Sequence, residues 1–247
     1  MRFDSVINCN KKIFFWFRDD DGNQLNDKFI RLIDFFEANN CPILEAVIPA
    51  NLDPMLVTYT ISKKHVYIGQ HGFSHTNYSD NIEVKSELCE SRDVKSVVNE
   101  QMFGNSILEK NFGDKYSHIF VPPFFEITDT IKNELVEKNI YKAFSIWWDN
   151  CMINNAIPEV NVQIDFIDWR KEEKFAGDKF IVEQIEREVK KICEKNYMEY
   201  GVIGVVLHHN LMCDAGINAL NNLIMEIKKC KNTEIIDVFR AIALVKA

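Results

Sequence analysis

The sequence predicts an α/β fold in which helices connect the strands of a mainly parallel sheet. Short β-rich runs alternate with segments of helical periodicity from end to end, which is typical of repeated βαβ units. The 247 residues, 47% of them hydrophobic, can bury one large core. No proline-, glycine- or serine-rich linker and no internal repeat interrupts the chain. We therefore expect residues 1–247 to form a single domain.

The elements follow from local patterns. The apolar run over residues 13–17 predicts a buried strand at 13–18. The next segment, about residues 26–38, predicts a helix because its apolar residues recur at helical spacing: Phe29, Leu32, Ile33 and Phe36. Further strands are expected at residues 43–48, 65–70, 118–122, 143–147, 160–165 and 202–208, and longer helices at 84–110, 178–197 and 215–230. Seven strands fit a closed or nearly closed barrel better than an open sheet, although periodicity alone does not distinguish them.

Composition excludes several classes of function. Acidic residues outnumber basic ones by 37 to 29, so the chain repels phosphate backbones, and we expect no nucleic-acid or anionic-membrane partner. No apolar run of membrane-spanning length and no signal-peptide core is present. The seven cysteines include no Cys-x-x-Cys pair, which favours free thiols in a reducing compartment. A cytoplasmic protein is expected.

Polar residues end the predicted strands, where α/β folds place their reactive groups. The first strand ends in Arg-Asp-Asp-Asp-Gly, residues 18–22. Adjacent buried carboxylates repel each other, and a bound cation would relieve that repulsion. The alternative is a solvated turn in which one Asp caps the following helix.

Four of the six histidines lie at two strand ends. His71 and His75 have the i, i+4 spacing that lets two imidazoles share an ion. Two imidazoles and one carboxylate leave coordination positions open, which indicates a hydrolytic rather than a structural metal site. His208, after the last strand, could protonate a leaving group.

Taken in order, these motifs resemble those of the polysaccharide deacetylases, the NodB-homology or carbohydrate esterase family 4 enzymes. The match runs from Arg18 to His209 and implies a distorted (β/α)7 barrel. In that family an Asp-Asp pair before Gly supplies first a base and then a metal ligand. The resemblance therefore implies that Asp20 is the base and that Asp21 binds the metal.

The second and third motifs imply further roles. Residues 71–75, His-Gly-Phe-Ser-His, match the motif whose histidines, here His71 and His75, complete the metal site. Residues 121–124, Val-Pro-Pro-Phe, match Arg-x-Pro-aromatic. This implies that Pro123 and Phe124 line the substrate site, with the amide N–H after the prolines stabilising the oxyanion.

The last two motifs imply the acid and its support. Residues 165–169 match Asp-x-x-Asp-Trp, which implies that Asp168 orients the catalytic histidine and that Trp169 walls the acetyl pocket. Residues 205–208 match Leu-x-Leu-His, which implies that His208 is the acid.

One departure from the family is Val121, which stands where the third motif has an arginine that holds the catalytic Asp. Arg18 or Arg92 could take over that role, because Arg18 shares a strand face with Asp20 and Arg92 follows the second motif. The chain looks most like a divergent bacterial branch labelled WalW-like. The motifs that carry this resemblance are residues 18–21, 46–50, 71–77, 85–87 together with Arg92, and 121–124.

The resemblance implies a metal-dependent hydrolase that removes an acetyl group from an N-acetylated sugar or glycan precursor. Zinc suits the ligands, and iron, cobalt, nickel or manganese would also fit. The alternative, which Val121 favours, is a deacetylase-like barrel that binds a glycan or metal without turnover.

Overall fold

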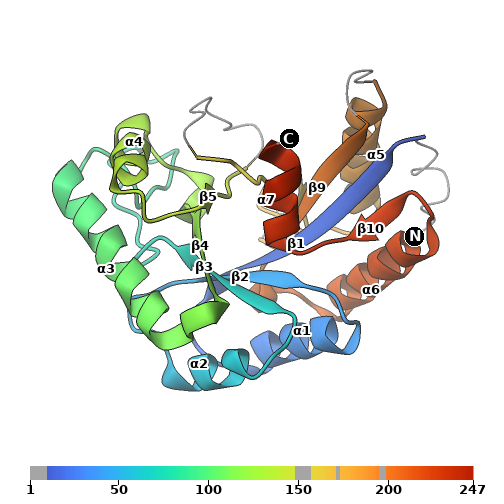
Figure 1. Cartoon of the computed structure of the whole chain (residues 1–247), viewed down its shortest axis with the longest axis horizontal. Helices are drawn as coiled ribbons and strands as arrows, with labels where there is room; N and C mark the ends of the chain where they lie inside the picture. Colours follow the sequence, from blue (N-terminus) through green and yellow to red (C-terminus); the bar gives the residue numbers. More distant parts are fainter. Residues whose placement is uncertain (1–9, 148–156, 171–172, 195–198, 247) are drawn as a thin grey trace.

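The computed structural model describes residues 10–147, 157–170, 173–194 and 199–246. One curved sheet organises this part of the chain (Figure 1). Seven of its strands follow one another in the order β5-β4-β3-β2-β1-β9-β6, β10 pairs with the start of β1, and all these pairings are parallel. The strands are β1 (Lys12–Gly22), β2 (Ile43–Val47), β3 (Val66–His71), β4 (Tyr116–Val121), β5 (Ala143–Phe144), β6 (Ile164–Asp165), β9 (Tyr200–Leu207) and β10 (Thr233–Ile235). A small antiparallel hairpin is formed by β7 (Ile167–Asp168) and β8 (Lys174–Phe175).

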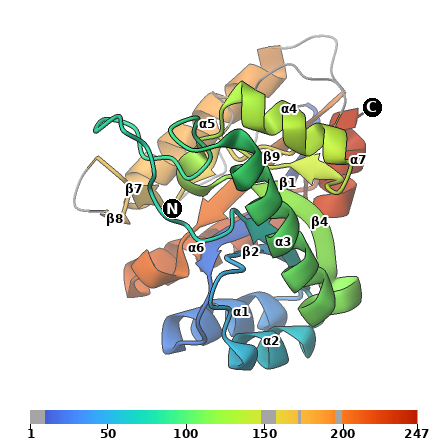
Figure 2. The same cartoon turned by 90° about the vertical axis from the view of Figure 1, so that its left-hand side faces the viewer.

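The helices surround this sheet (Figure 2). They are α1 (Asp27–Ala38), α2 (Pro54–Ile61), α3 (Val94–Phe112), α4 (Asp129–Lys138), α5 (Asp178–Glu194), α6 (Asp214–Lys229) and α7 (Val238–Lys246). Short 3₁₀ turns follow β4 at Pro123–Phe125 and β9 at His209–Leu211. Among the described residues no helix is both long and apolar enough to span a bilayer.

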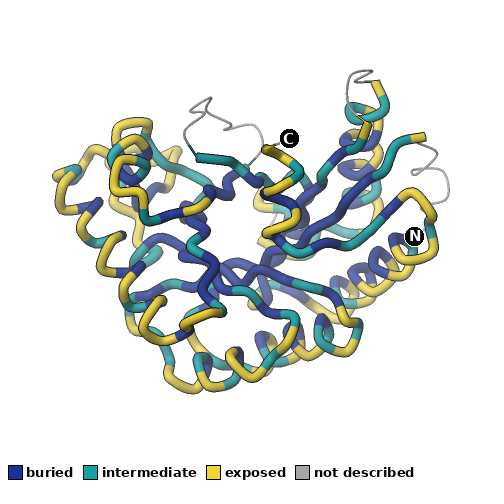
Figure 3. Tube along the Cα trace, viewed as in Figure 1, coloured by how far each residue is buried: buried dark blue, intermediate teal, exposed yellow. Residues whose placement is uncertain are grey.

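The two faces of the sheet bury different cores, and this alternation sets the direction of each side chain near the site. The outer face of β1 carries Phe15 and Phe17, which pack with apolar residues of α1, α5 and α6. The inner face carries Phe14 and Trp16, which pack with apolar residues of β2, β4, β9 and α7. Figure 3 shows the strands buried and the outward sides of the helices exposed.

The predicted α/β class and curved parallel sheet are confirmed, but several elements differ from expectation. The expected strands at 143–147 and 160–165 are reduced to two paired residues each, β5 and β6, supplemented by isolated bridges such as Trp147 to Val162. The helix expected from residue 84 begins only at Val94, because the Asp93 side chain accepts a hydrogen bond from the Ser96 N–H and caps it. Helices α2, α4 and α7 and strand β10 were not expected.

The expectation of free thiols holds for only some of the cysteines. Cys193 is disulfide-bonded. Cys41, Cys89, Cys213 and Cys230 are free, as expected. Disulfide pairing depends on tertiary proximity, which spacing does not reveal. The cysteines therefore no longer argue for a reducing compartment.

Candidate metal and catalytic site

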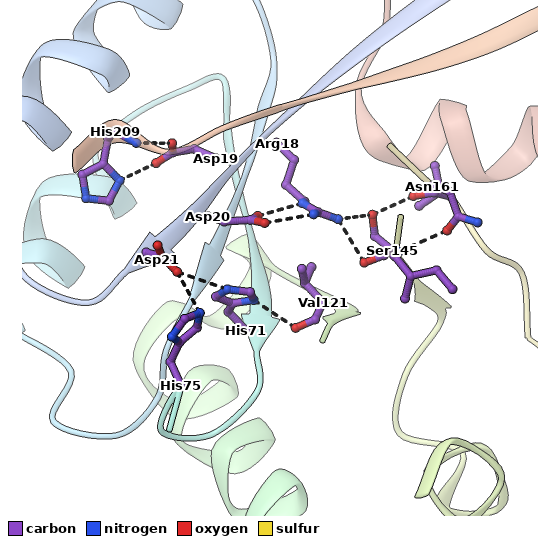
Figure 4. A network of polar contacts seen from close by, with 12 residues as sticks. Arg18, Asp19, Asp20, Asp21, His71, His75, Val121, Ser145, Asn161 and His209 are labelled. Carbon is purple, nitrogen blue, oxygen red and sulfur yellow. Dashed lines mark hydrogen bonds and ion pairs between the residues drawn. The ribbon is translucent and has the colours of Figure 1, made fainter. Parts of the chain in front are cut away.

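The carboxyl ends of β1 and β3 bring the predicted carboxylates and the two metal-site histidines together (Figure 4). Asp21 Oδ1 lies 3.3 Å from His71 Nε2 and 3.1 Å from His75 Nε2. Two ligands held about 2.1 Å from one ion, roughly 90–110° apart, lie about 3.0–3.4 Å from each other. The three side chains therefore have the spacing and the donor atoms of a divalent metal site.

The ionisation of Asp21 and His75 suits cation binding. Burial raises the pKa of Asp21, but His71 and the neighbouring histidine charges lower it more, so the pKa lies below its usual range. Burial and the charge of His71 lower the pKa of His75 to about 4. His75 is therefore neutral near pH 7 and offers a ring lone pair. The pKa of His71 shifts the other way. Burial lowers this pKa, but the hydrogen bond to Asp21 raises it more, so it lies above the usual value.

Local backbone conformation aims these ligands. Asp21 has a φ of 73°, in the left-handed region, and the β1–β2 register shifts between Asp19 and Gly22. Such a bulge redirects a side chain at a strand end. Gly72 has a φ of 56°, and a Cβ there would lie 2.4 Å from Pro123 Cγ. Glycine therefore lets the histidine loop pass close to the proline turn.

Two contacts fix the histidine loop. His71 Nδ1 lies 3.0 Å from the Val121 carbonyl oxygen, which assigns the ring proton to Nδ1 and leaves Nε2 free for a cation. The buried Glu87 carboxylate accepts the backbone N–H groups of Phe73 and Ser74 at 2.7 and 3.1 Å. Sequence reasoning noted Glu87 only as part of a motif and did not foresee this contact.

Asp20 faces the inner side of the sheet beside Arg18. Arg18 Nε and Nη2 lie 2.7 and 2.9 Å from the two Asp20 carboxylate oxygens, and both side chains are buried. Arg18 Nη1 also donates to the carbonyl oxygen and hydroxyl of Ser145, at 2.9 and 2.6 Å. Arg92 instead pairs with Glu100 and lies over the ring of Tyr78. Of the two candidate arginines, the structure places Arg18 at Asp20.

The predicted acid, His208, is buried after β9, and its ring meets that of Trp169 edge to face at 4.8 Å. Within the described chain, its Nδ1 has no hydrogen-bond partner. The buried carboxylate beside it is Asp165: burial raises the pKa of Asp165, and the charge of His208 partly offsets this. Asp165 Oδ2 also accepts the Trp169 indole N–H at 2.7 Å.

Asp168, predicted to orient His208, is only partly buried, and its Oδ1 accepts the Arg170 N–H at 3.1 Å. The two aspartates of this motif therefore differ in burial, and the buried one is the first. The motif match assigned the orienting role to Asp168; burial, which the motif does not reveal, distinguishes Asp165 at the end of β6 from Asp168 at the end of β7.

The predicted substrate-site residues lie next to the metal-site loop and the predicted acid. The Phe124 ring centroid lies 4.4 Å from that of His75, and Phe124 has a φ of 59°. Pro123 is buried against Gly72, whereas Trp169 is 43% exposed. One aromatic ring thus lies against a predicted metal ligand, His75, and another against the predicted acid, His208.

A second polar cluster lies on the outer face behind the site. Asp19 accepts the His209 backbone N–H at 2.8 Å through Oδ1, and Asp19 Oδ2 lies 2.7 Å from His209 Nδ1. Glu45 on β2 is fully buried beside Asp19. Burial and the charge of Asp19 raise the pKa of Glu45 well above its usual value. No sequence motif groups these three residues.

No family model matches the chain, and no curated protein is similar enough in sequence to match it. Solved structures do match. A Mycobacterium smegmatis protein assigned to the polysaccharide deacetylases superposes with a TM-score of 0.69 at 14% identity, over 97% of this chain and 92% of that one. The chain has the polysaccharide deacetylase fold.

Two further structures share this fold. A family 4 acetyl xylan esterase from Clostridium thermocellum, in complex with a cobalt ion, superposes with a TM-score of 0.56 at 15% identity, over 94% of this chain and 91% of that one. A CE4 family pseudoenzyme from Bacillus anthracis superposes with a TM-score of 0.62 at 12% identity, over 95% of this chain and 66% of that one. The predicted distorted (β/α)7 barrel is thus confirmed, while the WalW-like branch remains a prediction.

Proposed function

We propose that this protein is a metal-dependent hydrolase that removes the acetyl group from an N-acetylated sugar or glycan precursor. The observation that carries the proposal is the spacing of Asp21, His71 and His75, with Asp20 beside them. The cobalt-bound esterase of the same fold supports a divalent ion. Zinc suits two imidazoles and a carboxylate, and iron, cobalt, nickel and manganese are the alternatives.

A divalent ion at these ligands would polarise the acetamide carbonyl and acidify the attacking water. Asp20 takes the proton from that water, and Arg18 holds both Asp20 oxygens so that the base keeps one orientation. The Arg18 contact thereby fills the role of the arginine that Val121 replaces.

His208 donates a proton to the nitrogen of the departing amine, because without that proton the nitrogen would leave as an amide anion, a very poor leaving group. We assign Asp165, rather than Asp168, as the carboxylate that supports the charged form of His208, because Asp165 is the buried one. The backbone N–H of Phe124 stabilises the oxyanion of the tetrahedral intermediate, and Trp169 and Phe124 flank the acetyl group.

The second candidate function is a barrel that binds a glycan or metal without turnover. It is favoured by Val121 and by the existence of a pseudoenzyme with this fold. The retained Asp20, with its own arginine partner, favours the enzyme.

The deciding experiment is acetate release from a panel of N-acetylated sugars by protein stripped with a chelator and reloaded with each metal. His71→Ala and His75→Ala should lose both metal and activity, while the matched control His65→Ala keeps both. Asp20→Asn should keep the metal and lose turnover by about 10²–10⁴-fold, as expected for a general base. A wild type that binds metal fully and releases no acetate would favour the binding function.

A further inference from the structure

Three polar residues form a row across the outer face of the sheet, opposite the proposed catalytic groups. Asp19 pairs in register with Glu45 on β2 and with Leu207, the last residue of β9. His209 follows two residues after Leu207. Asp19, Glu45 and His209 are each at most 1% exposed.

The distance between Asp19 and His209 is that of a hydrogen bond. Asp19 Oδ2 and His209 Nδ1 are 2.7 Å apart, shorter than the 3.1 and 3.3 Å that separate the Asp21 oxygen from its two histidine nitrogens. The other Asp19 oxygen accepts the His209 backbone N–H. One carboxylate therefore binds both the main chain and the side chain of one residue.

This double contact lies where the sheet no longer joins β1 to β9. The β1–β9 ladder ends at the pair Asp19 and Leu207, so His208 lies beyond its last paired residue. Past this pair, the described residues show two hydrogen bonds between the end of β1 and the residues that follow β9. Both of them join Asp19 to His209. Asp20 and His208 are the chain neighbours of this pair.

We propose that Asp19 and His209 are a positioning pair that fixes, from the outer face, the separation of Asp20 and His208 on the inner face. The proposal rests on the proposed function, which makes Asp20 the base and His208 the acid. Side chains alternate between faces along an extended strand. A contact that holds Asp19 to His209 on one side therefore sets how far apart their neighbours stand on the other.

Glu45 supports this pair from β2. Both its carboxylate oxygens are buried and accept no hydrogen bond from the described residues. A Cβ added to Gly22 would lie only 2.3 Å from Glu45 Oε1. The Glu45 side chain therefore fills the space beside Gly22 at the β1 bulge. Asp19 is thus enclosed between Glu45 and His209.

The test uses two replacements of His209 in the metal-loaded protein. His209→Asn keeps the backbone contact and places an amide nitrogen near the position of Nδ1, whereas His209→Gln carries its amide nitrogen farther out. We expect His209→Gln to lower kcat by about 10²-fold, the cost of a misplacement of about 1 Å. KM and metal content should stay near wild type, and His209→Asn should recover most of the rate.

The matched control is Phe29→Leu, which removes an aromatic ring packed edge-on against His209, at 5.2 Å, and keeps the polar pair. Its kcat should be unchanged. Equal rates for wild type, His209→Asn and His209→Gln at full metal content would overturn the proposal, and so would a loss of rate in Phe29→Leu equal to that in His209→Gln.

Crystal structures of wild type and His209→Gln give a readout that needs no activity. The distance between the Asp20 carboxylate and the His208 ring should change in His209→Gln and be conserved in His209→Asn. An unchanged distance in His209→Gln would overturn the positioning role. If the wild type shows no activity, the proposed function fails, and this distance still decides whether the pair holds the two side chains.

Discussion

Arg18 and Asp20 form a buried ion pair with two contacts, although a single residue separates them in the chain. Alternation along β1 puts both side chains on the inner face, while Asp19 between them points to the outer face. The arginine comes from the strand that carries the base and not from the third motif. The carbonyl and hydroxyl of Ser145 fix the far end of its guanidinium.

Replacing Arg18 with Met should destabilise the protein by about 3–5 kcal/mol, because it leaves a buried carboxylate without its charged partner. The double variant Arg18→Met/Asp20→Asn should recover much of that loss, since no unpaired charge remains. Chemical denaturation of the four proteins of this cycle measures the coupling. Arg92→Met, which removes a partly exposed arginine, is the control and should change stability by less than about 1 kcal/mol. Additive effects in the cycle would contradict the pairing.

Asp165→Asn and Asp168→Asn should differ in activity. We expect Asp165→Asn to lower kcat by about 10²–10³-fold, because the buried charge beside His208 is lost. Asp168→Asn should stay within about threefold of wild type, since a partly exposed carboxylate is screened by water. Rates of acetate release at full metal content measure both. The opposite order would return the orienting role to Asp168.

Glu87→Ala should weaken metal binding although Glu87 is not a ligand. Its carboxylate holds two backbone N–H groups of the loop between His71 and His75, and loss of such outer contacts costs about 10–100-fold in metal affinity. Competition with a chromogenic chelator measures the affinity. Glu87→Gln, which keeps one acceptor oxygen, should be milder. The exposed Glu83→Ala is the control, and an equal loss there would contradict the role of Glu87.

The Asp19–His209 pair should make stability depend on pH. Burial alone would lower the pKa of His209, but Asp19 raises it above its usual value. A group with a raised folded-state pKa contributes its full stability below its unfolded pKa, about 6.5 here, and loses it as pH rises through the folded value. The free energy of unfolding of metal-free wild type, relative to His209→Asn, should therefore fall as pH rises from 6. A constant difference would contradict an ionic pair.

The sequence by itself determined the strand ends where the chemistry lies and the residue types that could hold a metal. Apolar runs located β1, β2, β3, β4 and β9, because a strand buried on both faces needs such a run whatever surrounds it. The i, i+4 histidines and the aspartate run predicted which side chains would meet. These are local properties of the chain.

Only the tertiary structure decided which side chains became partners. Arg18 and Arg92 were equal candidates in the sequence, and the fold places Arg18 at Asp20, with Ser145, the residue after edge strand β5, accepting hydrogen bonds from the other end of its guanidinium. Burial separated Asp165 from Asp168, and the packing of β2, β1 and β9 joined Glu45, Asp19 and His209. Two of these contacts join distant parts of the chain, because 127 positions separate Arg18 from Ser145 and 190 separate Asp19 from His209. Local periodicity carries no information on them, because the chain must first fold to bring these residues within reach.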